Sequence, residues 1–297
     1  MRQILLRHTL LSVWESNLAI SNSEAATFNE CEQKWKYAFV DKLAKRRKSQ
    51  ALNRGIVGHE LMAVFFSSLK NTHDWDYAME SLFDASIKLS SDSDPDRAST
   101  ASYLVNTIVS SLNYYKQRIL SWEIISVEEA YRVNLGDLGD GITYNFKVDL
   151  LVRENGGLIK VIDFKFVYDF YSDEQVDLLP QLPLYVGGLR ASGIPVARAY
   201  YMFIRYRNVK ELGEGNRFLL RHVNPSHSRI IRAFKDIIQT SEVIEFRRDR
   251  VPRRMPSTQG CKMCSFKQLC VAELNDVDTS IMRAEDYVTS DYGYGEE

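Results

Sequence analysis

Residues 144–185 decide the fold, and they read YNFKVDLLVRENGGLIKVIDFKFVYDFYSDEQVDLLPQLPLY. Two runs rich in β-branched and aromatic residues, Tyr144–Arg153 and Leu158–Phe166, lie on either side of Asn155-Gly156-Gly157. Strand-forming runs that flank such a turn predict a β-hairpin. Farther along, Pro180 suits the first position of a helix, because its missing N–H costs nothing there. The stretch therefore predicts a hairpin followed by a helix.

The hairpin would bring two carboxylates and a lysine together. Side chains alternate along a strand, so Asp163 and Lys165 point to the same face. A three-residue loop pairs Glu154 with Leu158, and counting back from that pair sets Asp149 opposite Asp163. Like charges opposite each other destabilise a sheet. A hard divalent cation, Mg²⁺ or Mn²⁺, would remove the conflict and takes oxygen ligands. The alternative is that Asp163 and Lys165 are solvated residues on an exposed strand face.

Further residues extend this pattern. Asp149, the triplet Asp163-Phe164-Lys165 and the pair Gln181-x-x-x-Tyr185 resemble the core of the PD-(D/E)XK nuclease superfamily, in its RecB-like branch. With Gly55-x-x-x-His59 upstream and four cysteines, the chain is similar to the iron-sulfur exonucleases of that branch. These include the nuclease part of AddB and the Cas exonucleases of CRISPR adaptation.

The resemblance spans the chain from Cys31 to Cys270. It implies an α/β fold with a central mixed β-sheet flanked by helices, a helical insert and a cysteine-bound metal-cluster lobe. Two positions depart from the family pattern: Phe146 stands where a small residue is common, and Phe166-Val167 replaces the usual Thr-Gly. These departures concern the geometry around the site and the choice of substrate.

The resemblance also implies a site for one or two divalent ions, Mg²⁺ or Mn²⁺. Lys165 would orient or deprotonate the attacking water, and Gln181 and Tyr185 would position the DNA. Glu128 is an auxiliary candidate, because relatives often carry an acidic residue at the matching position. The predicted metal ligands are His59, Asp149, Asp163 and the backbone carbonyl of Phe164, and the predicted catalytic residues are His59, Asp149, Asp163 and Lys165.

His59 follows Arg54-Gly55-Ile56-Val57-Gly58, a segment expected to introduce a helix. It lies one turn before Met62 and two turns before Phe66 in an apolar stripe, so it faces inward. The plain alternative is a core histidine that is hydrogen-bonded to backbone. Beside the carboxylate hairpin, the metal-ligand interpretation is favoured, because a neutral imidazole can complete a site made otherwise of oxygens.

All four cysteines of the chain can be assigned to one site. Cys261, Cys264 and Cys270 follow the spacing Cys-x-x-Cys-x₅-Cys, and Cys31, on an expected early helix, is the fourth. Four thiolates in a cytosolic chain indicate a metal rather than disulfides. Zn²⁺ is the commonest occupant of such sites, but a [4Fe-4S] cluster also takes four cysteines. The resemblance favours a structural [4Fe-4S] cluster, whereas the spacing alone leaves Zn²⁺ open.

The composition is that of an ordinary globular protein, with 297 residues, 45% hydrophobic and 26% charged. No run of eighteen apolar residues is present, and residues 1–20 lack a signal-peptide pattern, so we expect a cytoplasmic protein without membrane contact. The net charge of −1 requires any DNA contact to be local. The candidates are the basic runs Lys42–Lys48 and Arg247–Arg254, although such runs are common on solvated faces.

We expect five segments along the chain. These are an N-terminal segment with the first cluster cysteine (1–55), a helical region carrying the active-site histidine (56–122), the PD-(D/E)XK nuclease core (123–245), the three-cysteine lobe (246–275) and an acidic, flexible tail (276–297).

The expected function is that of a divalent-metal-dependent DNA exonuclease acting on single-stranded or end-frayed DNA in recombination, repair or replication. DNA and a helicase or recombination protein are the expected partners. The alternatives are an endonuclease of the same superfamily and a non-catalytic, metal-stapled subunit that binds nucleic acid. Closed circular DNA separates an exonuclease from an endonuclease, and a degradation assay that depends on divalent ions decides whether the protein is catalytic.

Overall fold

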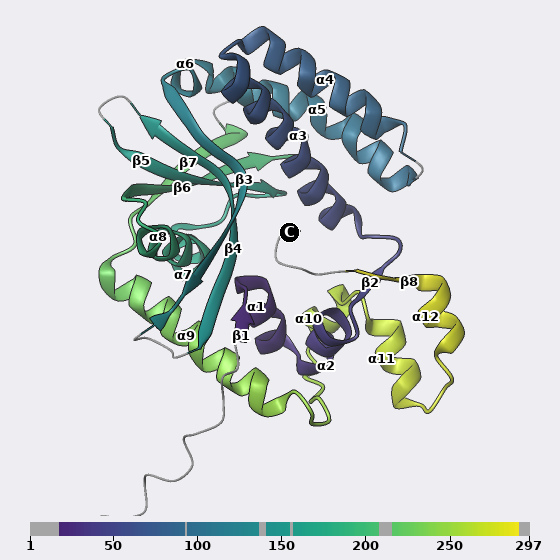
Figure 1. Cartoon of the computed structure of the whole chain (residues 1–297). Helices are drawn as coiled ribbons and strands as arrows, with labels where there is room; N and C mark the ends of the chain where they lie inside the picture. Colours follow the sequence, from purple (N-terminus) through teal and green to yellow (C-terminus); the bar gives the residue numbers. More distant parts are fainter. Residues whose placement is uncertain (1–17, 93, 137–140, 155–156, 208–215, 291–297) are drawn as a thin grey trace, which may run out of the picture.

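The computed structural model describes residues 18–92, 94–136, 141–154, 157–207 and 216–290. Helices cover both faces of a central sheet, and a smaller group of helices near the C-terminus lies beside it (Figure 1). In chain order the elements are β1 (Leu18–Ile20), α1 (Asn22–Glu30), α2 (Glu32–Trp35), the π-helix η1 (Lys36–Val40), β2 (Leu43–Lys45), α3 (Gln50–Thr72), α4 (Trp75–Ser90), α5 (Pro95–Tyr114), α6 (Lys116–Ile119), β3 (Trp122–Asn134), β4 (Ile142–Glu154), β5 (Ile159–Val167), α7 (Asp173–Leu178), α8 (Gln181–Ala191), β6 (Val196–Arg205), β7 (Phe218–Val223), α9 (His227–Arg247), α10 (Thr258–Met263), α11 (Lys267–Leu274), α12 (Ser280–Asp286) and β8 (Tyr287–Thr289).

The central sheet is mixed. Within the described residues it has six strands in the order β1-β4-β5-β6-β7, with β3 paired to β4 outside this path. β1 runs parallel to β4, and β5 runs parallel to β6, whereas the β3–β4, β4–β5 and β6–β7 pairs are antiparallel. The expected α/β class, with a mixed sheet flanked by helices, is therefore confirmed.

The predicted hairpin register is also confirmed. Leu150 pairs with Ile162 and Arg153 with Ile159, and the Glu154 N–H donates to the Leu158 carbonyl at 3.0 Å. Positions 155 and 156 of the predicted turn lie outside the described residues. Because the register holds, β4 and β5 bring their acidic residues to the same part of the sheet.

Helices α3, α4 and α5 cover one face of the sheet, where they share a buried cluster with strand residues such as Leu150, Ile162 and Phe164 (Figure 1). Asp74 and Asp94 accept hydrogen bonds from the first N–H groups of α4 and α5 and so begin these two helices. The helical region is therefore packed directly on the sheet that carries the carboxylates.

Helices α1, α8 and α9 cover the opposite face. Phe28 of α1, Leu189 of α8 and Phe234 of α9 belong to one buried cluster with Tyr144 and Tyr201 of the sheet. Among the described residues, no helix is both long and apolar enough to cross a membrane.

A third, small core lies near the C-terminus. Tyr37 and Ala38 of η1 pack there with Phe266, Leu269 and Tyr287. β8 pairs with β2 in a two-stranded sheet, so the segment expected to be a flexible acidic tail contains α12 and β8 up to Thr289. The expectation was wrong because acidic composition says nothing about the buried Tyr287, which anchors this end of the chain. Residues 291–297 lie outside the described part.

Two helices, α1 and α3, begin or end at other residues than the sequence predicted. Cys31 is not inside an early helix, since its extended backbone (φ −167°) separates α1 from α2. α3 begins at Gln50, capped by Ser49, rather than at the glycines that follow. Between β5 and α8 lies α7, which Ser172 and Gln175 begin with a capping box. Local capping side chains decide all of these boundaries except the break at Cys31.

Candidate active site

The centre of the site is the pair of acidic side chains on β4 and β5. Asp149 and Asp163 are 5% and 1% exposed. The Phe164 N–H donates to Asp149 Oδ2 at 2.6 Å, and Lys165 Nζ lies 2.9 Å from Asp163 Oδ2. The expectation that Asp163 and Lys165 share a face is confirmed. The expectation of two solvated residues on an exposed strand is wrong, because Asp163 is buried.

Glu128 joins the site from β3, the strand beside β4. The β3–β4 ladder pairs Val127 with Leu150 and Glu129 with Val148, so its register sets Glu128 opposite Asp149. Glu128 has a φ of +49°, a left-handed conformation that is unusual for a residue with a side chain. Such strained backbone clusters at functional sites.

His59 reaches these carboxylates from α3 on the neighbouring layer. Its Nδ1 lies 3.4 Å from Asp149 Oδ2 and 3.6 Å from Glu128 Oε1. In the described part of the chain, these three residues form the group whose ligand atoms all lie within 4.8 Å of one another. Glu128, which the sequence suggested only as an auxiliary candidate, is thus as close to His59 as Asp149 is. Asp163 lies outside this group.

The packing around α3 explains how His59 is placed. Phe66 stacks on Phe164 of β5 at 5.6 Å, and the Phe166 ring centre lies 5.9 Å from that of His59. A Cβ at Gly58 would meet the Phe166 ring at 2.4 Å, whereas nothing lies within 4 Å of a Cβ at Gly55. The structure shows that Gly58 alone is needed, and that it admits an aromatic ring.

α8 supports the lysine. Lys165 Nζ donates to Gln181 Oε1 at 2.6 Å, and Gln181 Nε2 donates to the Tyr185 hydroxyl at 2.9 Å. The Tyr185 ring is 6% exposed and stacks on Phe146 at 5.6 Å. Phe146, which departs from the family pattern, therefore helps to hold Tyr185. The structure links Gln181 and Tyr185 to Lys165 in a chain of hydrogen bonds.

Glu128 also forms an ion pair with Lys147, which was not among the predicted site residues. Lys147 Nζ lies 2.7 Å from Glu128 Oε2. Lys147 lies on β4 two residues before Asp149. Its pairing partner on β3 is Ala130. Lys147 and Asp149 share a face of β4 by alternation, and the β3–β4 register sets Glu128 diagonally across from Lys147, so the contact follows from the pairing of the two strands.

The site separates the pKa values of its two buried aspartates. Burial, with a further contribution from Asp149, raises the pKa of Asp163 to about 7 despite the nearby Lys165. Burial alone would also raise the pKa of Asp149, but His59, the Phe164 N–H and Lys165 together lower it. Burial opposes the charge on His59, yet Asp149, Glu128 and Asp163 outweigh it and raise the pKa of His59 to about 10. Without a metal, a proton on His59 balances part of the negative charge.

The donor set fits a hard divalent cation. His59 Nδ1, Glu128 Oε1 and Asp163 Oδ2 are buried and have ion-pair partners at 2.9–3.6 Å but no hydrogen bond, and the buried Asp163 Oδ1 has no hydrogen bond either. Buried polar atoms without hydrogen bonds are costly and rare. Carboxylate oxygens with one imidazole are suitable ligands for Mg²⁺ or Mn²⁺, which would compete with the proton on His59. The carbonyl of Phe164 stays a predicted ligand.

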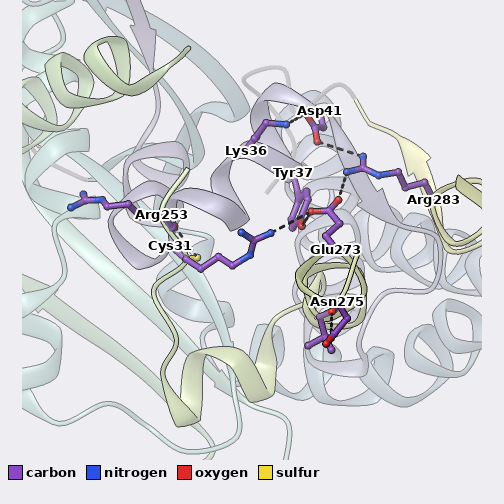
Figure 2. A network of polar contacts seen from close by, with 10 residues as sticks. Cys31, Lys36, Tyr37, Asp41, Arg253, Glu273, Asn275 and Arg283 are labelled. Carbon is purple, nitrogen blue, oxygen red and sulfur yellow. Dashed lines mark hydrogen bonds and ion pairs between the residues drawn. The ribbon is translucent and has the colours of Figure 1, made fainter. Parts of the chain in front are cut away.

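The cysteines lie where the segment between α1 and α2 meets the segment after α9. Cys31 Sγ lies 3.9 Å from the Arg253 carbonyl (Figure 2). Burial raises the pKa of the Cys264 thiol, and the proximity of Cys31 raises it further. Cys264 and Cys270 both pack against the small C-terminal core, whereas Cys261 is exposed. In the described part of the chain, no three cysteine sulfurs lie within 4.8 Å of one another.

Arginines of the second basic run, Arg247–Arg254, form ion pairs within the protein. Arg247 and Arg253 both bind the buried Glu32 carboxylate, and Arg254 lies 3.6 Å from Glu273. Glu273 also accepts hydrogen bonds from Tyr37 and Arg283, in a network that extends to Asp41 and Lys36 (Figure 2). Much of the charge in Arg247–Arg254 therefore stabilises the C-terminal lobe.

Solved structures show what the fold resembles. A crystal structure described as a "Putative exonuclease" from Eubacterium rectale has a TM-score of 0.54 and 13% sequence identity, and the match covers 92% of this chain and 98% of that chain. A structure described as "SSO0001" has a TM-score of 0.38 and 16% identity, with 88% of this chain and 90% of that chain covered. No curated protein matches this chain. At such identities the first similarity shows the fold alone.

A family comparison goes further. The sequence model of the PD-(D/E)XK nuclease superfamily matches residues 19–271. This range contains the central sheet except Leu18 at the start of β1, α3 with His59 and all four cysteines. Because the match covers most of the chain, the protein belongs to the PD-(D/E)XK nuclease superfamily.

Proposed function

We propose that the protein is a divalent-metal-dependent DNA exonuclease of the RecB-like branch that acts on single-stranded or end-frayed DNA. The observation that carries this proposal is the group of the half-buried His59 and Glu128 with the buried Asp149, beside the Asp163–Lys165 pair. Several of its donor atoms have no hydrogen-bond partner within the protein. Membership in a nuclease superfamily supports phosphodiester hydrolysis with DNA as the substrate.

The residues of the chain can be given separate roles. Mg²⁺ or Mn²⁺, held by His59, Glu128, Asp149, Asp163 and the Phe164 carbonyl, would polarise the phosphodiester and acidify a water. Lys165 would orient that water or take its proton. Gln181 holds the Lys165 amine, and Tyr185 holds Gln181, so both act by positioning the lysine. With Tyr185 buried, this role replaces direct contact between Tyr185 and DNA.

We also propose that Cys31, Cys261, Cys264 and Cys270 hold a structural [4Fe-4S] cluster, with Zn²⁺ as the alternative. The folded chain already brings residue 31 to the C-terminal lobe. The Gln33 N–H donates to the Arg253 carbonyl, and a Cβ at Gly260 would lie 3.4 Å from Glu30 Oε1. By the loop-entropy model, a covalent link across more than two hundred residues is worth about 5 kcal/mol. The cluster would thus hold the lobe to the sheet.

The nuclease proposal is tested with 5′- and 3′-labelled single-stranded and duplex DNA, and with closed circular DNA. We expect degradation of linear DNA with Mg²⁺ or Mn²⁺ and none with EDTA. Lys165→Met should lower the rate at least 100-fold, which is the lower range for a positioned acid–base group. Lys34→Met, which removes an exposed ion pair with Glu30, is the control and should leave the rate unchanged. A Lys165→Met protein with full activity would refute the assignment, and cleavage of closed circles would favour the endonuclease alternative.

The cluster proposal is tested by anaerobic purification, metal analysis and an absorbance scan. We expect stoichiometric iron and a brown protein. Cys31→Ala should be colourless and more sensitive to protease. Stoichiometric zinc without iron would assign this site to Zn²⁺, and it would leave the nuclease proposal unaffected because the cysteines are separate from the acidic group.

A further inference from the structure

A surface of aromatic and arginine side chains lies where β5 and β6 end. It consists of Tyr168 and Phe170 after β5, Arg205 at the end of β6, Tyr206 and Arg207 after it, and Arg54 on α3. We call it the aromatic–arginine surface. Neither the carboxylate site nor the cysteine lobe uses these residues.

Each arginine of this surface lies over an aromatic ring. The guanidinium carbon of Arg207 is 5.1 Å from the centre of the Tyr168 ring. Arg205 lies 4.0 Å from the Phe170 ring, and Arg54 lies 4.5 Å from the Tyr206 ring. The rings of Tyr168 and Tyr206 meet edge to face at 6.1 Å. Cation–π contacts of this kind hold the rings and cations in one arrangement.

The surface is open to solvent and positive. Tyr168 is 56% exposed, and the Arg207 side chain is 44% exposed. Asp169 is the acidic partner of both Arg205 and Arg207, whereas Arg54 lies over the Tyr206 ring. An exposed tyrosine held by an arginine contributes little to the core, whereas aromatic and Arg side chains in a positive groove are the elements that bind single-stranded nucleic acid.

The surface is continuous with the carboxylate site. Phe166, whose ring contacts His59, is followed by Val167, and the Tyr206 N–H donates to the Val167 carbonyl at 3.1 Å. Arg54 lies five residues before His59 on α3, which is about 7.5 Å along a helix. A DNA strand leaving the carboxylate site along the ends of β5 and β6 would therefore meet these rings within one or two nucleotides.

We propose that the aromatic–arginine surface binds single-stranded DNA next to the scissile phosphate, with bases stacked on Tyr168 and Tyr206 and phosphates bound by Arg54 and Arg207. This inference rests on the proposed function, and it explains why single strands would be preferred. The bases of a duplex are stacked on one another and cannot stack on protein rings without unpairing. Stacking is independent of base identity, so the surface confers no sequence preference.

The test is the binding of a fluorescent oligonucleotide in EDTA, measured by anisotropy so that no cleavage occurs. Tyr168→Ala should weaken binding of single-stranded DNA at least fivefold, which corresponds to the loss of about 1 kcal/mol for one stacked base. Tyr168→Phe keeps the ring and should bind as the wild type does. Tyr77→Ala, which removes an exposed tyrosine on α4, is the control and should change nothing.

An oligonucleotide of the same length without bases distinguishes stacking from phosphate contact. Tyr168→Ala should leave its binding unchanged, whereas Arg207→Ala should weaken binding of both oligonucleotides. Unchanged binding of normal single strands by Tyr168→Ala, or an equal loss for both oligonucleotides, would overturn the inference. Degradation of DNA by the wild type is scored separately. A wild type that degrades DNA while Tyr168→Ala binds normally would refute the surface alone, and ring-dependent binding without degradation in Mg²⁺ or Mn²⁺ would refute the nuclease proposal alone.

Discussion

At the scale of single residues, Asp149 and Asp163 differ in what balances their buried charge. Asp149 faces His59 and accepts the Phe164 N–H, whereas Asp163 makes no hydrogen bond and has an ion pair with Lys165 at 2.9 Å. Asp163 therefore has a pKa raised to about 7, far above the value near 3.9 in an unfolded chain. A pKa raised on folding gives a contribution to stability that is complete below pH 3.9 and is lost as the pH rises through 7.

We therefore predict that Asp163→Asn removes cleavage and stabilises the metal-free protein at pH 8 by a few degrees in Tm, because about 1 kcal/mol corresponds to about 2–4 °C at this size. In EDTA the wild-type Tm should fall more than the variant Tm between pH 5 and pH 8. Mn²⁺ should raise the Tm of the wild type more than that of the variant. Identical pH profiles of the two proteins in EDTA would contradict the prediction. Calorimetry with and without Mn²⁺ supplies the measurement.

Tyr185 provides a second residue-scale prediction. Tyr185→Phe keeps the ring against Phe146 but removes the hydroxyl that accepts from Gln181, so Gln181 and then Lys165 lose a positioning contact. Loss of about 1 kcal/mol at the transition state lowers kcat about fivefold, with little change in Tm. Tyr115→Phe, in the helical layer, is the control and should keep the wild-type kcat. An unfolded Tyr185→Phe whose folded fraction keeps full activity would show that the residue is simply part of the core.

At the scale of elements, the site depends on how closely α3 approaches β5. A Cβ at position 58 would overlap the Phe166 ring, and the ring is held between His59 and the cluster under α3. Overpacking of this kind costs about 1–3 kcal/mol. We predict that Gly58→Ala destabilises the protein by this amount, displaces His59 and weakens Mn²⁺ binding.

Gly55→Ala is the matched control for this prediction. It lies one turn earlier on the same helix with open space around it, so the added methyl group should raise stability by up to about 1 kcal/mol. Thermal melts and Mn²⁺ titrations of both variants make the comparison. Equal effects of the two substitutions would show that the α3–β5 contact does not place His59.

At the scale of the whole molecule, Glu32 connects α2 to the end of α9 and the segment after it through protein contacts alone. Its carboxylate is 1% exposed and accepts from the Arg253 N–H at 2.9 Å and from the Arg247 guanidinium at 2.8 Å. Burial would raise the pKa of Glu32, but these donors outweigh it and lower the pKa. A lowered pKa contributes stability above the unfolded value near 4.3 that is lost as the pH falls through the folded value.

We predict that Glu32→Gln costs about 1–3 kcal/mol and exposes residues 248–275 to protease even when the protein is purified with the proposed metal at its cysteines. The wild type should show the same protease sensitivity when the pH is lowered below 4. Glu30→Gln, which alters the exposed pair with Lys34, should cost less than about 1 kcal/mol. If both variants resist protease equally at pH 7, the ends of the chain are held by other contacts.

The sequence by itself determined the local features. The β4–β5 register follows from the turn residues and the alternation of the strands, and it was sufficient to place Asp163 beside Lys165. The helical spacing of Gln181 and Tyr185 likewise predicted that they lie on one face, and a hydrogen bond joins them. These features depend on residues near in sequence, whose geometry is set by strand and helix periods.

The tertiary structure alone decided how distant segments meet. The pairing of β3 with β4 sets Glu128 opposite Asp149, and no local pattern signals this pairing or the left-handed conformation of Glu128. The roles of Lys147, Gly58 and Glu32 also depend on partners on other strands, on another element or more than two hundred residues away. Burial, charge compensation and close packing are properties of three-dimensional contacts. Periodicity can show which face a side chain occupies, but not what lies opposite that face.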